Sequence, residues 1–279
     1  MMKKINPGSA LVFLGALFWS LNAPIVKFLH LDSFLICGLR SVIAFAVLAP
    51  FIRPKQLKWN IWMLVYVCAY CGLCLSIILA LNMTSAPVAI GMQYTAAIWL
   101  FLVNWAFTRK FSGRSFLPVC VISAGVVFFM CSGTDETSSL GNLIALGEGV
   151  LFALMTVSSK KAAGTNPLGL TAIGNLFTGV LVLSLFPTST VGMVHMGRTD
   201  WILMLILGAV QVGGGYGFYN LGVQKVTPQK ASVLALWEMI LGPVWVALFL
   251  REYPTVPVLV GFVIILAGMF LDAKLSESK

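Results

Sequence analysis

Residues 8–27 read GSALVFLGALFWSLNAPIVK, and residues 141–160 read GNLIALGEGVLFALMTVSSK. The two stretches align without gaps, and further matches follow in the same order along the chain. The pairs that come into register are Gly8 with Gly141, Trp19 with Phe152, Lys27 with Lys160, and Ala124-Gly125 with Ala267-Gly268. Any two apolar helices look somewhat alike, but the shared order of these pairs favours an internal repeat.

The composition excludes a soluble protein. Only 10% of the 279 residues are charged and 59% are hydrophobic, with a mean hydropathy of +0.96. Soluble domains carry about 25% charged residues. The apolar run that begins at Leu11 continues to Phe28 without a small-residue cleavage site. We therefore interpret it as a first membrane span and not as a signal peptide.

A transmembrane helix needs about 20 apolar residues, and the chain contains ten such stretches. They cover residues 9–28, 34–52, 60–81, 87–107, 116–132, 142–159, 168–186, 201–223, 231–250 and 255–271. The predicted fold is therefore an all-α integral membrane protein with ten transmembrane helices. The connections are short and leave no room for a separate soluble domain.

Each half of the repeat holds five spans, and we place the halves at residues 1–136 and 137–279. Because five is an odd number, the second half enters the membrane from the side opposite to the first. The sequence therefore predicts two inverted five-helix repeats. Secondary transporters built in this way hold their substrate between the repeats, near the midplane of the membrane.

The Lys and Arg residues predict the orientation. If the N-terminus is cytoplasmic, 14 of the 18 basic residues lie in cytoplasmic loops and tails, whereas Lys27, Arg198 and Arg251 lie outside. This bias predicts a multi-pass protein of the cytoplasmic (plasma) membrane with both termini in the cytoplasm. It also explains the net charge of +9 without a nucleic-acid partner. Membrane lipids with acidic headgroups are the expected partners of these residues.

Two carboxylates, Glu148 and Glu238, fall inside spans, where charges are costly and usually mark a substrate or ion path. Glu148 shares one helix stripe with Phe152, Met155 and Ser159, and the repeat partners of these four residues are Gly15, Trp19, Asn22 and Val26. We expect both stripes to face a central space, with Glu148 pointing into a cavity opposite Gly15. The alternative is a structural hydrogen bond from Glu148 to a neighbouring helix.

Three motifs are shared with a known family. The repeats open with Trp19-Ser20 and Phe152-Ala153 at matching positions, residues 80–89 read ALNMTSAPVA, and residues 226–238 read VTPQKASVLALWE. On these motifs the chain resembles the EamA-type ten-helix transporters of the drug/metabolite transporter (DMT) superfamily. Members often carry Pro after the glutamate, whereas Met239 stands here and Pro243 follows, which is expected to displace any kink. The resemblance implies a carrier of amino acids, other metabolites or drugs.

Glu238 lies about two turns into the ninth span, and its repeat partner on the fourth span is Ala96, close to Gln93 and Tyr94. The family match fits either substrate contact or a structural hydrogen bond at Glu238. An acidic group that meets water alternately from each side can also carry a coupling proton. Protons are therefore an expected partner, together with a small-molecule substrate.

Arg40 is the cation within the second span, and its repeat partner is Asn175. An Arg in lipid must pair or reach the surface. Family members often carry Arg at this position, so we favour a structural or gating tie over substrate binding for both residues.

Several aromatic residues lie deep in their spans, where they can stack on a ring or face a cation. Packing against lipid or protein is an equal alternative for each. Residues 211–220, QVGGGYGFYN, predict close helix contacts or a local unwinding. The candidate substrate-binding residues are Trp19, Asn22, Tyr70, Gln93, Tyr94, Glu148, Tyr216, Trp237 and Glu238.

The leading prediction is a secondary transporter that exports an amino acid or a related metabolite by alternating access, with a proton carried by Glu148 or Glu238. The alternative is an importer or exporter of organic cations such as quaternary amines, caged by the two acids and the aromatic residues. A carrier of lipid-linked sugars stays open. An enzyme or a channel is disfavoured because no catalytic constellation or ring of charges is present. No metal or cofactor is predicted, since the six cysteines suit buried small hydrophobes, and the sequence does not predict the oligomeric state.

Overall fold

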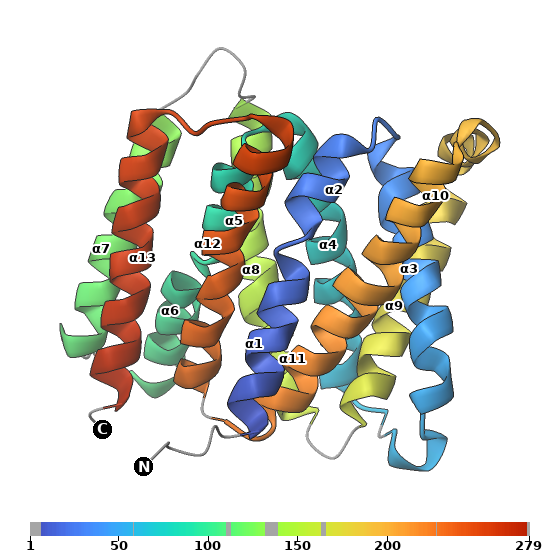
Figure 1. Ribbon diagram of the computed structural model, residues 1–279. Helices are drawn as coiled ribbons and strands as arrows, with labels where there is room; N and C mark the ends of the chain where they lie inside the picture. The colour runs from blue at the N-terminus through green and yellow to red at the C-terminus, as the bar shows by residue number, and fades with distance from the viewer. Residues whose placement is uncertain are drawn as a thin grey trace, which may run out of the picture.

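A computed structural model describes residues 7–57, 59–109, 113–131, 139–162, 166–226 and 228–277. Within these ranges the chain folds into helices that run side by side between two faces of the molecule (Figure 1). The first and last described helices begin and end on the same face, which we call the termini face. The predicted boundary between the halves, at residues 136–137, lies outside the described residues.

Helices occupy all ten predicted spans. The first to the fifth span are α1 (Pro7–Trp19) with α2 (Asn22–Phe28), α3 (Ser33–Leu48), α4 (Ile61–Met83), α5 (Ala86–Gln93) with α6 (Ala96–Thr108), and α7 (Gly113–Cys131). The sixth to the tenth are α8 (Ser139–Lys161), α9 (Pro167–Leu185), α10 (Arg198–Leu205) with η4 (Ile206–Gly214) and α11 (Gly215–Val223), α12 (Pro228–Leu250), and α13 (Val256–Glu277). Six spans are long and apolar enough to cross a membrane, and the other four are shorter apolar helices. The fold is therefore the predicted all-α membrane protein.

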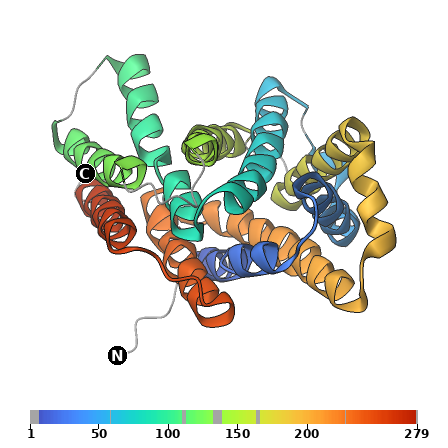
Figure 2. The ribbon, with the colours of Figure 1, turned by 90° about the horizontal axis from the view of Figure 1, so that it is seen from above.

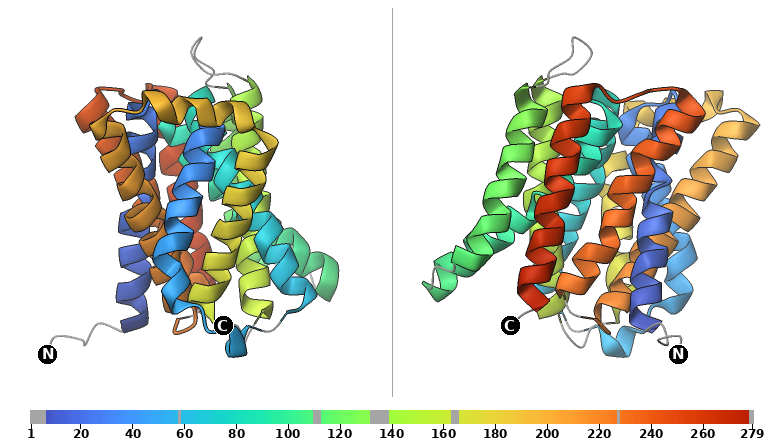
Figure 3. Two further views of the ribbon diagram at one scale, coloured as in Figure 1. Left: turned by 90° about the vertical axis from the view of Figure 1, so that its right-hand side faces the viewer. Right: turned by 60° about the vertical axis from the view of Figure 1, so that its left-hand side comes forward.

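Short helical turns join some of these spans. Residues Ala49–Phe51 (η1) and Pro54–Gln56 (η2) connect α3 to α4 on the termini face. On the opposite face, η3 (Pro187–His195) lies across the ends of the helices, as the left view in Figure 3 shows. An ion pair between Lys27 Nζ and Glu252 Oε2, 2.9 Å long, joins α2 to the α12–α13 connection.

Three of the spans are interrupted in the middle, and each interruption has a local cause. Pro24 has no backbone N–H to continue the hydrogen-bond pattern of the α-helix, so the helix is interrupted between α1 and α2. The Thr95 hydroxyl donates to the carbonyl oxygen of Met92 at 2.7 Å, where α5 gives way to α6. Glycines 213–215 favour helix formation poorly, and here the eighth span contains the π-helical stretch η4. The interruptions all lie beside the central residues described below.

Packing between the helices follows the inverted repeat. The equivalent spans of the two halves pair directly, with α7 against α13 and α3 against α9. The remaining contacts occur in matching sets: α4 packs on α8 as α11 packs on α1, and α5 packs on α8 as α12 packs on α1. Seen from above, α7 and α13 close one end of the bundle and α3 and α9 the other (Figure 2). Exchanging the halves thus reproduces the same neighbours.

Glycine contacts show the same symmetry at the level of atoms. A Cβ atom on Gly125 of α7 would lie 2.6 Å from Ile265 Cγ1 of α13 and 2.8 Å from the Gly261 carbonyl oxygen. A Cβ atom on Gly268, the repeat partner of Gly125, would lie 2.6 Å from Ile122 Cγ1 and 3.0 Å from the Ile122 nitrogen. The two glycines therefore make equivalent contacts, Gly125 of α7 with α13 and Gly268 of α13 with α7.

This packing leads to a stability prediction for the α7–α13 interface. Gly125→Ala is expected to lower the melting temperature by several degrees, because backbone atoms of α13 must move and overpacking costs about 1–3 kcal/mol. Gly147→Ala in α8 is the matched control, since a Cβ atom there meets nothing within 4 Å. Scanning fluorimetry of the purified variants makes the comparison. Equal melting temperatures for the two variants would contradict the tight contact at Gly125.

Candidate functional site

The predicted site residues gather in the middle of the bundle, with one exception. Eight of the nine candidate substrate-binding side chains are buried: Trp19, Asn22, Tyr70, Gln93, Tyr94, Glu148, Tyr216 and Glu238. Trp237 is instead 42% exposed on the outer surface, where its ring meets the edge of Phe13 at 5.7 Å between centroids. Consecutive residues of a helix point in different directions, so burial of Glu238 turns Trp237 outwards. We therefore remove Trp237 from the candidate site.

A cluster of aromatic rings fills the space between the repeats. Trp19 of α1 lies 4.7 Å from Tyr216, 4.6 Å from Tyr219 and 6.4 Å from Phe152, measured between ring centroids. Trp19 and Phe152, which are repeat partners, thus meet at the centre of the molecule. The rest of the cluster extends in both directions: Tyr70 lies 4.9 Å from Tyr216, Tyr66 lies 5.7 Å from Tyr70, and Tyr94 lies 6.3 Å from Phe152. We call these seven residues the aromatic cluster.

Glu238 of α12 is held by the end of α5. The Tyr94 hydroxyl lies 3.0 Å from Glu238 Oε2 and 2.7 Å from the carbonyl oxygen of Ala235, and Gln93 Nε2 donates to Glu238 Oε2 at 3.4 Å. The side chain is therefore fixed between the α5–α6 break and α12. Of the two alternatives predicted for Glu238, the structural hydrogen bond is present here.

Glu148 of α8 is fully buried, and both of its carboxylate oxygens lack a hydrogen-bond partner among the described residues. It lies close enough to Glu238 for the two groups to interact electrostatically. The next residue, Gly149, packs directly on Thr95 at the α5–α6 break. The predicted alternative of a hydrogen bond from Glu148 to a neighbouring helix is thus not realised in the described part of the chain.

The prediction of a cavity between Glu148 and Gly15 is wrong. A Cβ atom on Gly15 would lie 2.8 Å from the Gly215 carbonyl oxygen and 3.0 Å from the Tyr219 nitrogen. The glycine of α1 therefore makes room for the backbone of α11 and not for a cavity. A small residue inside a span marks either free volume or close helix approach, and the sequence did not separate the two.

Arg40 connects four segments of the bundle. Its Nη1 donates to Asn22 Oδ1 at 2.8 Å and to Gln211 Oε1 at 3.5 Å, and its Nη2 donates to the Cys74 carbonyl oxygen at 2.8 Å. These bonds link α3 to α2, η4 and α4. The Nε atom is buried without a partner, and the one ion pair among the described residues does not include Arg40.

Asn175 makes a similar tie from α9. Its Nδ2 donates to the Tyr70 hydroxyl at 2.8 Å and to the Thr171 carbonyl oxygen at 2.9 Å. Nearby, Asn220 Nδ2 donates to Thr171 Oγ1 at 2.7 Å and to the Tyr66 hydroxyl at 3.2 Å. The sequence did not nominate Thr171, Tyr66 or Asn220 for the site. Two of them did carry a signal: Tyr66 lies one helical turn from Tyr70, and Asn220 ends the glycine-rich stretch 211–220.

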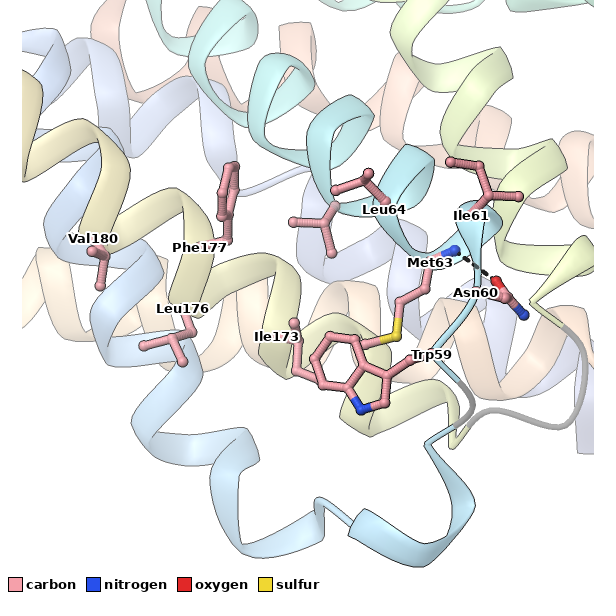
Figure 4. Close-up of a pocket in the computed structure, with 10 residues that line it drawn as sticks. Trp59, Asn60, Ile61, Met63, Leu64, Ile173, Leu176, Phe177 and Val180 are labelled. Carbon is pink, nitrogen blue, oxygen red and sulfur yellow. Dashed lines mark hydrogen bonds between the residues drawn. The ribbon is translucent and has the colours of Figure 1, made fainter.

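A groove of about 850 Å³ lies on the outer surface, between α4 and α9 near the termini face. Figure 4 shows Trp59, Met63 and Leu64 on one side of it and Ile173, Leu176 and Phe177 on the other. A second cavity of about 350 Å³ is formed by residues of α2, α10 and α12. Both are lined almost entirely by apolar side chains, and neither is lined by Glu148 or Glu238. The two acids are instead enclosed by protein, so the site is closed in this conformation.

Comparison with known proteins identifies the family. The sequence model of the EamA-like transporter family matches residues 6–131 and 139–272. The chain belongs to this family. The EamA-like transporter family comprises membrane transporters of small solutes and is not a family of enzymes. This result confirms the resemblance to the DMT superfamily found in the sequence.

Solved structures add evidence on the fold alone. A structure titled "Crystal structure of protein" matches with a TM-score of 0.68 and 17% sequence identity, over 97% of this chain and 98% of the other. No curated protein sequence matches this EamA-like chain. The likeness in fold thus extends over nearly all of the given sequence.

The two acids make opposite predictions for stability. Glu148→Leu is expected to raise the melting temperature, because an unpartnered buried polar group costs about 1–3 kcal/mol that an apolar side chain avoids. Glu238→Leu is expected to lower it, because the Gln93 amide loses its acceptor and Tyr94 loses one of two. Scanning fluorimetry of both variants without substrate tests this. Destabilisation by Glu148→Leu as large as that by Glu238→Leu would mean that Glu148 has a structural role.

Proposed function

We propose that this EamA-like protein is a secondary transporter that exports an amino acid or a related small metabolite across the cytoplasmic membrane. The observation that carries the proposal is Glu148, a fully buried carboxyl group without a partner among the described residues, at the centre of the two repeats. A group that is costly to bury and unused by the fold is expected to serve a ligand.

Transport proceeds by alternating access. In the closed conformation the aromatic cluster and the two acids are sealed from both faces, and opening requires one repeat to move against the other. The breaks at Ser20-Leu21 and Tyr94-Thr95 and the π-helical η4 lie beside this centre. They are the places where the helices are able to bend without unfolding. The two repeats, residues 1–136 and 137–279, act as the moving units.

Glu148 and Glu238 carry the coupling proton in this proposal. The two carboxyl groups interact electrostatically across the site, so ionisation of one affects the other. Glu238 is fixed by Tyr94 and Gln93, whereas Glu148 is available to exchange its proton for a substrate amine. No nucleotide site is needed, because the proton gradient supplies the energy.

The proposed orientation has both termini in the cytoplasm. The described connections on the termini face carry Arg53, Lys55, Arg109 and Lys225, which fits the positive-inside rule. Attraction of these residues to acidic lipid headgroups follows from the same arrangement.

A ligand screen followed by transport in liposomes tests the function. Purified protein is expected to show a rise in melting temperature with one or more amino acids, and less or none with amines and nucleosides. Liposomes that contain the protein are then expected to accumulate the same amino acid when a pH gradient is imposed. Glu148→Gln should abolish the driven uptake. Lack of any shift or uptake with amino acids would refute the proposed substrate.

Organic cations are the second candidate, favoured by the unpartnered Glu148 carboxyl group beside the aromatic cluster, since rings and acids together form a cation cage. Labelled quaternary amines in the same liposomes separate the two functions. Cation uptake that persists in the Glu148→Gln, Glu238→Gln double variant would argue against this candidate, because neither acid would then be required.

A further inference from the structure

The apolar groove on the outer surface is built by both repeats. Its volume of about 850 Å³ falls within the range of about 300–1,000 Å³ that is typical of ligand sites. One wall is formed by residues 59–67, at the start of α4, and the other by residues 173–180 of α9 (Figure 4). Since α4 belongs to the first repeat and α9 to the second, a molecule seated in the groove touches both repeats.

The dimensions and chemistry of the groove match an acyl chain. Leu64 and Val180 are each 57% exposed although they lie within membrane spans, so in a membrane they face lipid. Helix geometry gives each wall a length of about 10 Å, from Asn60 to Val67 in α4 and from Ile173 to Val180 in α9. One leaflet contributes about 15 Å, half of the hydrocarbon thickness. The groove therefore accommodates a chain from the leaflet at the termini face.

The connection from α3 to α4 is held against the start of α9 by two contacts. Asn166 Nδ2 donates to the Phe51 carbonyl oxygen at 2.6 Å. Leu57 packs on Gly169 of α9, where an added Cβ atom would lie 3.2 Å from Leu57 Cδ2. The connection thus runs from one wall of the groove to the other, and Figure 4 shows it passing the end of the groove.

This connection brings polar groups to the end of the apolar walls. Arg53 and Lys55 lie between its two anchored residues, and both are exposed. The next described residues, Trp59 and Asn60, already line the groove. Asn60 Oδ1 accepts from the Met63 nitrogen at 3.0 Å, and Figure 4 shows Nδ2 on the side away from that bond, where it is able to donate to a phosphate or ester oxygen. Two cations and an amide donor are therefore held at one end of the groove.

The charge around the groove is positive throughout. Residues 33–134 and 149–199, which include α4, α9 and the connections that precede them, contain no Asp or Glu. The one ion pair among the described residues, between Lys27 and Glu252, lies on the opposite face. Basic groups beside a cleft between spans are the means by which membrane proteins bind acidic lipid headgroups.

We propose that the α4–α9 groove binds one acidic phospholipid of the membrane, with an acyl chain along the apolar walls and the phosphate at Arg53, Lys55 and Asn60. This is a defined site, in contrast to the general attraction of the termini face to acidic headgroups. The inference goes beyond the proposed function, because it does not depend on which substrate is transported.

An acidic phospholipid fits the groove better than the other candidates. Homodimers usually have a twofold axis, and an axis through this groove along the membrane normal would bring Arg53 and Lys55 of two copies together. Like charges at such a contact oppose association. A zwitterionic lipid covers the apolar walls but leaves the cations without a net counter-charge. An acidic phospholipid satisfies both ends of the site.

Binding of defined lipids tests the site. Full-length protein in nonionic detergent is titrated with phosphatidylglycerol or with phosphatidylcholine of the same acyl chains, and bound lipid is counted by native mass spectrometry. Wild type is expected to bind one phosphatidylglycerol at least about tenfold more tightly than phosphatidylcholine, because two cations face its phosphate.

The headgroup end is tested by removing its two charges. The Arg53→Gln, Lys55→Gln double variant is expected to bind the two lipids within about threefold of each other. Its melting temperature without lipid should equal that of wild type, since both side chains are exposed. Lys55→Gln alone should already reduce the preference at least about threefold, which keeps the site testable if the double variant does not fold.

The matched control removes two cations from the same face at the other end of the bundle. Arg109 follows α6 and Lys274 lies near the end of α13, and both are exposed on the termini face. The Arg109→Gln, Lys274→Gln double variant has the same net charge as the groove variant. It should keep the full preference for phosphatidylglycerol.

The apolar end is tested by filling the groove. Val180→Trp is expected to weaken the binding of both lipids at least about fivefold, because the acyl chain loses its contact with the walls. Val127→Trp, on the outer surface of α7, is the matched control, since Val127 is 59% exposed against 57% for Val180. It should bind both lipids as wild type does.

Three results would overturn the inference. Equal affinity of wild type for the two lipids would mean that the groove does not recognise charge. Equal loss of preference in the groove and control charge variants would mean that the whole basic face attracts acidic lipid without a defined site. Unchanged binding by Val180→Trp would place the acyl chain elsewhere. None of these results affects the uptake measured in liposomes, so failure of the lipid site is distinguishable from failure of the proposed substrate.

Discussion

Ionisable side chains at the depth of the hydrocarbon layer must be enclosed by protein, because lipid offers them neither water nor a counter-charge. In this transporter Arg40, Glu148 and Glu238 are enclosed by helices from both repeats. The surrounding structure follows from this constraint. Asn22, Gln211 and the Cys74 carbonyl surround the guanidinium, while Tyr94 and Gln93 fix one of the acids. Glu148, whose two carboxylate oxygens both lack a hydrogen-bond partner among the described residues, distinguishes the centre from a purely structural core.

The helices around the buried centre are related by the symmetry of the repeat, but the helix interruptions do not follow this symmetry. The equivalent glycines at 125 and 268 make equivalent contacts across the α7–α13 pair, which joins one helix of each half. The first and fourth spans are interrupted, whereas their counterparts, α8 and α12, are continuous helices. In an inverted repeat, such asymmetry between equivalent elements is what an exchange of conformations requires. In the proposed mechanism, the closed centre and the interruptions beside it act together.

The spans were predictable because a stretch of about 20 apolar residues is visible in the sequence itself. Its detection does not depend on which helices pack beside it. The inward stripe of Glu148 and Phe152 was predictable for a related reason, since helix period and repeat register both determine it. The cavity predicted at Gly15 and the substrate contact predicted for Trp237 were both wrong. Each prediction depended on which helix packs against that residue, and the sequence does not show this. The partners of Arg40 and the Asn220–Thr171 bond join residues 18 to 171 positions apart. Such bonds depend on the packing of helices that the sequence alone does not place.

The central claim is that the buried middle of the bundle opens to water on each side in turn, and cysteine accessibility measures this most directly. A Phe152→Cys variant without native cysteines, placed in sealed vesicles, is treated with a membrane-impermeant thiol reagent from either side. We predict labelling from both sides, slowed by a bound amino acid, and none at a Val263→Cys control on the exposed outer surface of α13. Labelling of Phe152→Cys from neither side, or from one side under all conditions, would contradict alternating access.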